Sequence, residues 1–404
     1  MTDKIEASLQ TTTPLFLGGA FSRPETNQNG EPELRPPTFR GALRYWLRAY
    51  LGSNAHWPLD AVRRKEDAIF GSVTDESGMG SAVNVRIRNA QIVSIASFRK
   101  DAKEPIATGP NAGKDIPTGK DYLYWSMDHT RHEGQELLAR KFIAANSKFD
   151  LILQTRPTAR NLPEFKYVAA SLWLLLNLGG VGSRSRRTAG SLSPVRAVSF
   201  GELQFQMPAV QDSQQAAQFL GQNLALIRSW ISPEGHSARP AYDVIDPQYC
   251  RIWILGVWPS GDEAVKGIGE KLRNRLRSNP DHDKVYDWLK GKPIPEIQRS
   301  VFGLPIQYRY SDHSGGMLQA RLKSNPFTKF ERRASPLWLR ITRTADGKYV
   351  GVATLFMSQF LPVGAELYAS NARPSPNPPP LSPPRDYSTI IGWIGSHAEE
   401  VQYA

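Results

Sequence analysis

Cysteine is almost absent from this chain of 404 residues, because Cys250 is the only one. A single cysteine excludes an intramolecular disulfide and a zinc site built from several thiolates. Long apolar runs are also lacking. The longest, around residues 168–178, contains Ser171 and Asn177 and has only about half the length of a membrane span. The N-terminal MTDKIEASLQ has no apolar signal core. These absences predict a cytoplasmic protein with no membrane partner.

Acidic residues are too few to balance the basic ones. Fifty Lys and Arg against 38 Asp and Glu give a net charge of +12, and 33 of the 50 are Arg. This excess favours a polyanionic partner, because Arg grips phosphate with two parallel hydrogen bonds and stacks on bases. A GC-rich genome would also raise the Arg content without any function. Composition therefore leaves both interpretations open, and the positions of the arginines have to decide.

Hydrophobic periodicity predicts an α+β fold with two similar halves. The first half has the order β-α-β-β-α-β, with strands at 5–11, 82–89, 148–155 and 195–205 and helices at 36–51 and 163–178. The second half has a strand at 249–257, a helix at 263–277, a hairpin at 337–342 and 349–355, and a last strand at 387–394. This order is that of a ferredoxin-like (RRM-like) fold with insertions. We expect two tandem domains, residues 1–208 and 209–404, with an extended Pro-rich segment at 371–385.

The helix at 36–51 carries an arginine edge. Arg40, Arg44 and Arg48 fall within about 80° of one another at 100° per residue. No acid occurs at residues 34–59, and like charges at i, i+4 and i+8 repel unless an anion lies against them. We expect this edge to contact RNA, with Tyr45 stacked on a base. The alternative is packing against acidic groups from elsewhere in the fold.

A glycine- and arginine-rich loop follows the second helix at residues 179–191, with the sequence GGVGSRSRRTAGS. Glycines let a backbone approach a ligand closely, and Arg and Ser donate to phosphate oxygens. The loop lacks the Lys-Ser/Thr ending of a Walker loop, and no strand leads into it as a dinucleotide motif requires. The RNA-binding candidates here are Gly180, Gly182, Ser183, Arg184, Ser185, Arg186 and Arg187. A flexible surface turn is the alternative.

A basic segment at 321–343 supplies the last candidates, Arg332 and Arg333. Phe327 and Phe330 lie between its cations, as in a groove that follows a nucleic-acid backbone. An exposed strand edge protected by charge would have the same composition.

Signals for catalysis are poor. His129 and His132 are three residues apart, with an arginine between them and without the spacing of a zinc protease. The sequence has no nucleophile elbow and no aspartate pair. We therefore expect no catalytic residues, no metal and no cofactor.

Several motifs together resemble the RAMP superfamily, and in particular the first RAMP subunit of the type III-B (Cmr) CRISPR effector complex. They are TPLFLGGA (13–20), PELRPPTFRGALRYWLRA (32–49), IFGS (69–72), GGVGSRSRRTAGSL (179–192), VFGLP (301–305) and RRASPLWLRI (332–341). They follow the order of that family and extend over residues 13–341.

The resemblance implies two RAMP domains of modified ferredoxin-like fold in an antiviral ribonucleoprotein. It also implies a non-catalytic subunit that receives the 3′, spacer-derived end of the guide RNA and the paired target RNA, beside other RAMP subunits. Two alternatives stay open. One is a metal-independent endoribonuclease that processes guide RNA, and the other is a protein scaffold whose basic faces meet acidic neighbours.

Overall fold

The computed structural model describes residues 3–18, 31–73, 78–105, 113, 115–128, 130–132, 135–137, 139–159, 162, 164–231, 236–277, 281–330, 332–373 and 377–403. Helices and strands are mixed throughout these residues, which confirms the predicted α+β class. Within the same ranges, no helix is both long enough and apolar enough to cross a membrane.

The first half forms an antiparallel sheet covered by helices. Its strands are, in spatial order, β12 (Leu192–Pro194), β1 (Lys4–Thr11), β11 (Lys148–Thr155) and β4 (Val83–Gln91). Helix α1 (Pro36–Leu51) comes between β1 and β4, and α4 (Phe165–Asn177) between β11 and β12. In chain order the strands therefore lie 4-1-3-2, as in a split β-α-β arrangement. Ile5, Ala7 and Leu9 alternate along β1 and point into the core.

The second half repeats this order around another antiparallel sheet. Its strands are β19 (Leu337–Arg343), β20 (Tyr349–Phe356), β15 (Cys250–Trp258) and β22 (Glu399–Glu400). Helix α6 (Gly261–Arg277) follows β15, and α8 (Ser388–Gly395) precedes β22. Read from the other edge, the strands again lie 4-1-3-2.

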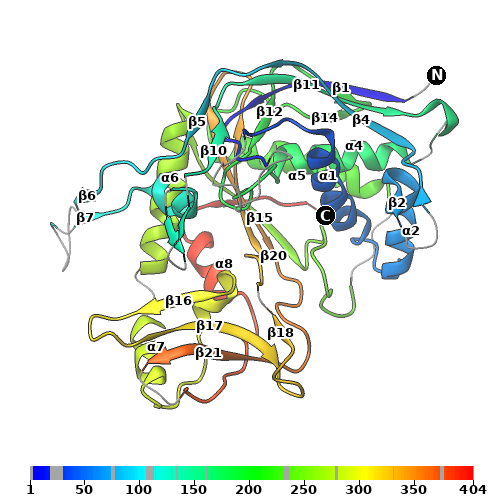
Figure 1. The fold of residues 1–404 in the computed structure, drawn as a ribbon. Helices are drawn as coiled ribbons and strands as arrows, with labels where there is room; N and C mark the ends of the chain where they lie inside the picture. The colour runs from blue at the N-terminus through cyan, green and yellow to red at the C-terminus, as the bar shows by residue number, and fades with distance from the viewer. Residues whose placement is uncertain are drawn as a thin grey trace.

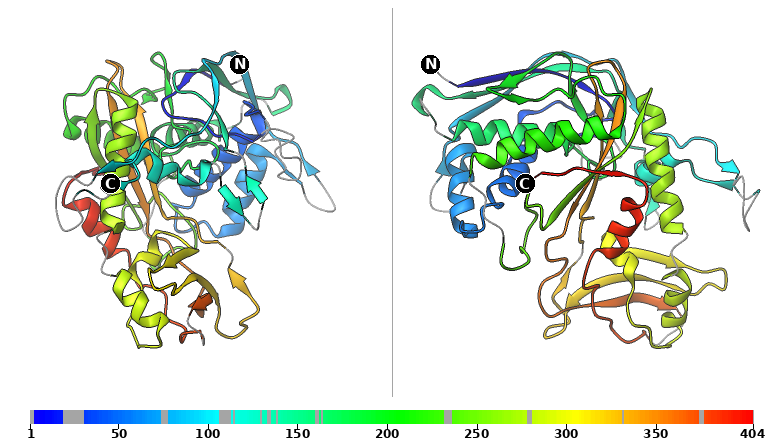
Figure 2. Two further views of the ribbon diagram at one scale, coloured as in Figure 1. Left: turned by 60° about the vertical axis from the view of Figure 1, so that its left-hand side comes forward. Right: turned by 180° about the vertical axis from the view of Figure 1, so that it is seen from behind.

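The two sheets share one helical layer. Helices α1, α4 and α5 (Ser213–Ser229) lie between the first sheet and the second, while α6 covers the far side of the second sheet (Figures 1 and 2). Cys250, Ile252 and Ile254 of β15 point into the core of the first half, whereas Trp253 and Leu255 join the core under α6. The second sheet is therefore buried on both faces.

A third sheet is inserted in the second half and lies at the lower end of the molecule in Figure 1. It contains β16 (Ile306–Arg309), β17 (Gly315–Leu322), β18 (Lys329–Phe330) and β21 (Ala365–Arg373), with α7 (Asp281–Leu289) packed beside it. In the Pro-rich segment, Leu381 exchanges backbone hydrogen bonds with Leu367 of β21 at 2.7 and 2.8 Å. The described part of that segment is thus an extended strap attached to this sheet.

Short elements connect these layers. They are α2 (Leu59–Phe70), β2 (Ser72–Val73), β3 (Gly78–Met79), β5 (Ile95–Ser97), β6 (Glu104–Pro105), β7 (Asp115–Ile116), α3 (Gly119–Tyr124), η2 (Trp125–Met127), β8 (Thr130–His132), β9 (Gln135–Leu137), β10 (Lys141–Ile143), η3 (Pro157–Ala159), β13 (Ser199–Phe200), β14 (Leu203–Gln204) and η4 (Gln298–Phe302).

Two predicted strands are wrong. The segment 387–394 is helix α8, because Ile390 and Ile394, four residues apart, are buried together on one helical face. The β-branched and aromatic composition of this segment is typical of a strand, but packing on the second core overrides that preference. The segment 195–205 contains only β13 and β14, because the fourth strand of the first sheet ends at Pro194.

Candidate nucleic-acid interface

Helix α1 forms as the sequence predicts, and its arginine edge faces α2. Pro36 and Pro37 occupy its first positions, where no backbone N–H is needed, and Gly52 follows its last residue. The opposite face buries Phe39, Trp46 and other apolar side chains. Arg40, Arg44 and Arg48 are all half-buried.

Two of the three arginines on this edge have acidic partners, as the alternative interpretation of the sequence allowed. Glu66 of α2 is only 4% exposed, and it accepts hydrogen bonds from Arg44 Nε at 2.5 Å and Arg48 Nη1 at 2.8 Å. Arg44 also reaches Asp67 Oδ1 at 3.3 Å and the backbone oxygen of Gly71 at 2.6 Å. Both acids come from the next helix, α2 (Leu59–Phe70), which follows the acid-free residues 34–59. Packing against acidic groups therefore holds for Arg44 and Arg48.

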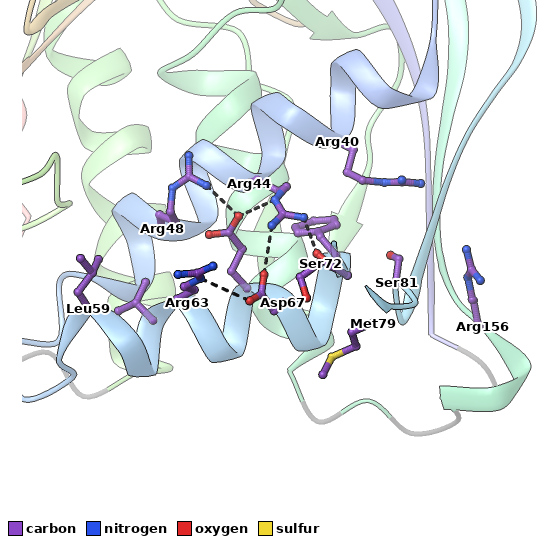
Figure 3. Close-up of a pocket in the computed structure, with 14 residues that line it drawn as sticks. Arg40, Arg44, Arg48, Leu59, Arg63, Asp67, Ser72, Met79, Ser81 and Arg156 are labelled. Atoms are coloured by element: carbon purple, nitrogen blue, oxygen red, sulfur yellow. Dashed lines mark hydrogen bonds and ion pairs between the residues drawn. The ribbon is translucent and has the colours of Figure 1, made fainter. Parts of the chain in front are cut away.

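Positive charge still exceeds negative charge beside these pairs. A groove of about 590 Å³ lies between α1, α2 and the end of β11 (Figure 3). Its lining contains five arginines, Arg40, Arg44, Arg48, Arg63 and Arg156, and two acids, Glu66 and Asp67. This leaves three positive charges in excess, with hydroxyl groups from Ser72 and Ser81 nearby.

Three of the five arginines are not held by Glu66. Arg40 Nε is buried and has no hydrogen-bond partner within the described residues. The Arg63 side chain is 70% exposed and lies 3.8 Å from Asp67. Arg156 donates to the side-chain oxygen of Asn84 at 2.9 Å and makes no ion pair with any described residue. Figure 3 shows Arg48 and Arg63 toward one end of the groove and Arg40 and Arg156 toward the other.

Sequence reasoning missed Arg63 and Arg156. For Arg63 a signal existed, since Arg63 and Asp67 are four residues apart on an amphipathic helix. Arg156 joins the groove only through the pairing of β11 with β4, which brings residue 155 opposite Val83. No local pattern predicts that approach.

Tyr45 is not placed to receive a base. Its ring packs against Trp338, with ring centres 5.1 Å apart, and the guanidinium of Arg186 lies 5.6 Å from its centre. Its hydroxyl donates to Asp243 Oδ2 at 2.7 Å. Burial raises the pKa of Tyr45, with the charge of Asp243 adding to the effect. Tyr45 thus belongs to the contact between the two halves, which is a correction to its expected role.

The glycine–arginine loop packs tightly between the two halves and is not a flexible turn. Ser183 N–H donates to the backbone oxygen of Phe16 at 2.9 Å, and Thr188 N–H donates to that of Leu339 at 2.8 Å. A Cβ on Gly182 would lie 2.3 Å from the backbone oxygen of Phe16, and Gly182 has a φ of +84°. Glycine is needed there for close contact with the protein itself. Gly180 is buried, and Ser183 and Ser185 are half-buried.

Two of the loop arginines bind the backbone of the second half. Arg186 donates to the carbonyl of Ser335 and lies 4.6 Å from the ring centre of Trp338. Arg187 donates to the carbonyl of Leu337 at 3.3 Å, and burial lowers its pKa to about 10, with Arg184 contributing. The expectation that both are free to bind phosphate is therefore wrong.

Arg184 lies apart from these contacts. Its Nε donates to Ser126 Oγ at 2.9 Å, and its guanidinium lies over the ring of Trp125. Burial lowers the pKa of Arg184, and the nearby charge of Arg332 adds to this effect.

The basic segment at 321–343 also contains both exposed arginines and arginines that bind the protein backbone. Arg332 is exposed, whereas Arg333 donates to the carbonyl of Phe360 at 2.7 Å. Arg340 is 1% exposed and donates to the backbone oxygens of Leu175, Gly179 and Leu192 and to Thr342 Oγ1. Arg340 thus ties β19 to the end of α4, where carbonyls lack helical partners. Arg333 and Arg340 are structural residues.

The histidine pair lies in a segment that the structure describes only in part. His129 lies outside the described residues, and the side chain of His132 is not described. Across the described ranges, no three His, Cys, Asp or Glu side chains come together as metal ligands.

Comparisons with known proteins agree with the resemblance seen in the sequence. The RAMP superfamily model matches residues 8–193. CRISPR system Cmr subunit Cmr1-1 of Pyrococcus furiosus is 24% identical over 336 residues, which cover 82% of each chain. Subunit Cmr1-2 of that organism is 30% identical over 190 residues, which cover 46% of this chain and 91% of the relative. The crystal structure of apo Cmr1 from P. furiosus superposes with a TM-score of 0.58 at 18% identity and covers 99% of both chains.

Proposed function

The chain belongs to the Cmr1 subunits of the RAMP superfamily, and from this membership we propose that it is a non-catalytic RNA-binding subunit of a type III-B (Cmr) CRISPR complex. It holds the 3′, spacer-derived end of the guide RNA, the paired target RNA, or both, beside other RAMP subunits. Its tandem RAMP domains correspond to residues 1–208 and 209–404. The strand order 4-1-3-2, found in both sheets, supports this division.

The arginine groove between α1 and α2 carries this proposal. Its lining has five arginines and two acids, and both acids are already bound by arginine. A polyanion that lies along the groove meets the excess charge, and the buried Nε of Arg40 has no hydrogen-bond partner among the described residues that it would have to give up. Contacts to phosphate hold an RNA strand whatever its sequence. Such binding suits a guide RNA, because pairing between guide and target supplies the specificity.

The arginines have different roles in this proposal. Arg44 and Arg48 fix α1 on α2 through the buried carboxylate of Glu66. Arg40, Arg63 and Arg156 make the phosphate contacts, because none of them is held by that carboxylate. Arg44 and Arg48 therefore hold the two helices together, while Arg40, Arg63 and Arg156 are available to a ligand.

The experiment is a titration of labelled single-stranded RNA with the purified full chain, with RNA integrity checked on a gel. We expect binding without cleavage. Cleavage would favour the guide-processing endoribonuclease, and neither binding nor cleavage would favour a protein scaffold.

A charge-matched pair of variants locates the binding surface. The triple variant Arg40→Ala, Arg63→Ala, Arg156→Ala should lose most of the affinity. The control removes three cations in and after α7, Lys284, Lys290 and Lys292, and should bind nearly as tightly as the wild type. Equal losses in both variants would show that net charge, and not the groove, determines binding.

A further inference from the structure

A second cationic site lies beside an exposed tryptophan, away from the arginine groove. We propose that Trp125, Arg184 and Arg332 form a nucleotide-binding site, in which an unpaired RNA base stacks on the indole and its phosphate lies against the two guanidinium groups. This inference rests on the proposed function, since it adds a stacking contact for the same RNA.

Trp125 is exposed to an unusual degree for its size. Its residue surface is 59% accessible, although it follows directly on the buried residues Leu123 and Tyr124 of α3. The η2 turn holds its backbone at the surface. The guanidinium carbon of Arg184 lies 5.8 Å from the centre of the indole ring. An exposed aromatic ring with a cation at its face is the usual platform for a base of single-stranded nucleic acid.

Arg184 is held in place by a side-chain hydrogen bond and by the conformation of its loop. Ser126, the neighbour of Trp125, accepts a hydrogen bond from Arg184 Nε at 2.9 Å. The backbone of Arg184 has a φ of +60°, a left-handed conformation that few residues other than glycine adopt. The preceding residue, Ser183, fixes the loop by its backbone bond to Phe16. The guanidinium is therefore presented at a defined position beside the indole.

The charge around this site selects an anion. Arg332 is exposed, and after burial its charge is the second cause that lowers the pKa of Arg184, so the two cations repel each other. Neither makes an ion pair with any residue that the structure describes. The acid that follows η2, Asp128, is paired with Lys100 at 3.2 Å. A phosphate between the two guanidinium groups would relieve their repulsion.

The combination of ring and charge favours a nucleotide over a protein partner. An exposed tryptophan alone could contact either a nucleotide or a protein. Arg184 lies over the ring and forms no ion pair with any described residue, which favours a ligand that is both aromatic and anionic, as a nucleotide is. Tyr45 shows the contrast: its ring also lies near an arginine, Arg186, but the arginine and Trp338 are its packing partners inside the protein.

The test uses the full chain and single-stranded RNA that contains 4-thiouridine. Irradiation of the wild-type complex, followed by trypsin digestion, should give a crosslink in the peptide of residues 121–131. Trp125→Ala should weaken RNA binding by about 5- to 150-fold, the range for one stacked base, and Trp125→Phe should retain most of the affinity. Val363→Ala, which also shortens an exposed apolar side chain, should have no effect.

The outcomes separate this inference from the proposed function. Wild-type protein that does not bind RNA would contradict the proposed function itself. RNA binding that depends on the arginine groove but not on Trp125, with no crosslink in residues 121–131, would overturn only the nucleotide site. Unchanged RNA affinity of Trp125→Ala with lost assembly onto other subunits would assign this surface to a protein contact. If Trp125→Ala fails to fold, the crosslink on wild-type protein and the Trp125→Phe titration still decide whether a base stacks on Trp125.

Discussion

The pairing of Arg44 with Glu66 makes the α1 edge a test of fold and function together. Arg44→Glu removes the hydrogen bonds to Glu66 and Asp67 and puts a third carboxylate beside them. Breaking a buried ion pair costs about 3–5 kcal/mol. The Arg44 side chain is 27% exposed, which allows some solvent screening, so we expect the lower end, about 3 kcal/mol. Thermal and denaturant unfolding of the full chain measure this loss.

The control and the compensating variant come from the same two helices. Arg63→Glu should change stability by less than about 1 kcal/mol, because its side chain is 70% exposed and lies 3.8 Å from Asp67. Glu66→Arg added to Arg44→Glu should restore part of the stability, since it returns opposite charges to the pair. An unchanged unfolding midpoint for Arg44→Glu, together with lost RNA affinity, would refute this reasoning and return Arg44 to the set of free cations.

Three further predictions concern the contact between the halves and the core. Arg340→Met should destabilise the protein by at least about 3 kcal/mol, measured by denaturant unfolding, because three buried backbone carbonyls would lose a charged donor at about 1–3 kcal/mol for each unsatisfied group. Gly190→Ala should lower the yield of folded protein or its melting temperature, since the new Cβ would lie 1.9 Å from the backbone oxygen of Val181 at a φ of +66°; wild-type stability would contradict this. Burial raises the pKa of the Cys250 thiol to about 12, so a thiol reagent at pH 8 should react with it only after unfolding. Above about pH 8.5, the pKa of an exposed thiol, the thiol of the unfolded chain loses its proton while the buried thiol of the folded chain keeps it. The free energy of unfolding should therefore fall as the pH rises above that value.

The elements with clear local signals could be predicted from the sequence. Helix α1 runs from Pro36 to Leu51 as predicted, because prolines begin it and Gly52 follows it. Strand β11 has the predicted bounds, Lys148–Thr155, because its apolar residues alternate. Helix α8 was missed, since its composition favours a strand and only packing on the second core reveals its helical face.

The candidate site was harder to predict, because its partners are distant in sequence. Arg40, Arg44 and Arg48 lie on one edge of α1 as predicted. The local sequence does not show that Glu66 of α2 binds two of them, Arg44 and Arg48. The glycines of the loop signal close approach, as expected. What approaches is the backbone of Phe16, and the sequence contains no local sign of that.

The most direct test of the central claim is the salt dependence of RNA affinity. If Arg40, Arg63 and Arg156 each neutralise one phosphate of single-stranded RNA, replacing all three with Ala should reduce the slope of log affinity against log salt by about 2. The slope of the variant that lacks Lys284, Lys290 and Lys292 should equal that of the wild type. An unchanged slope in the groove variant would contradict the claim that RNA lies along this groove.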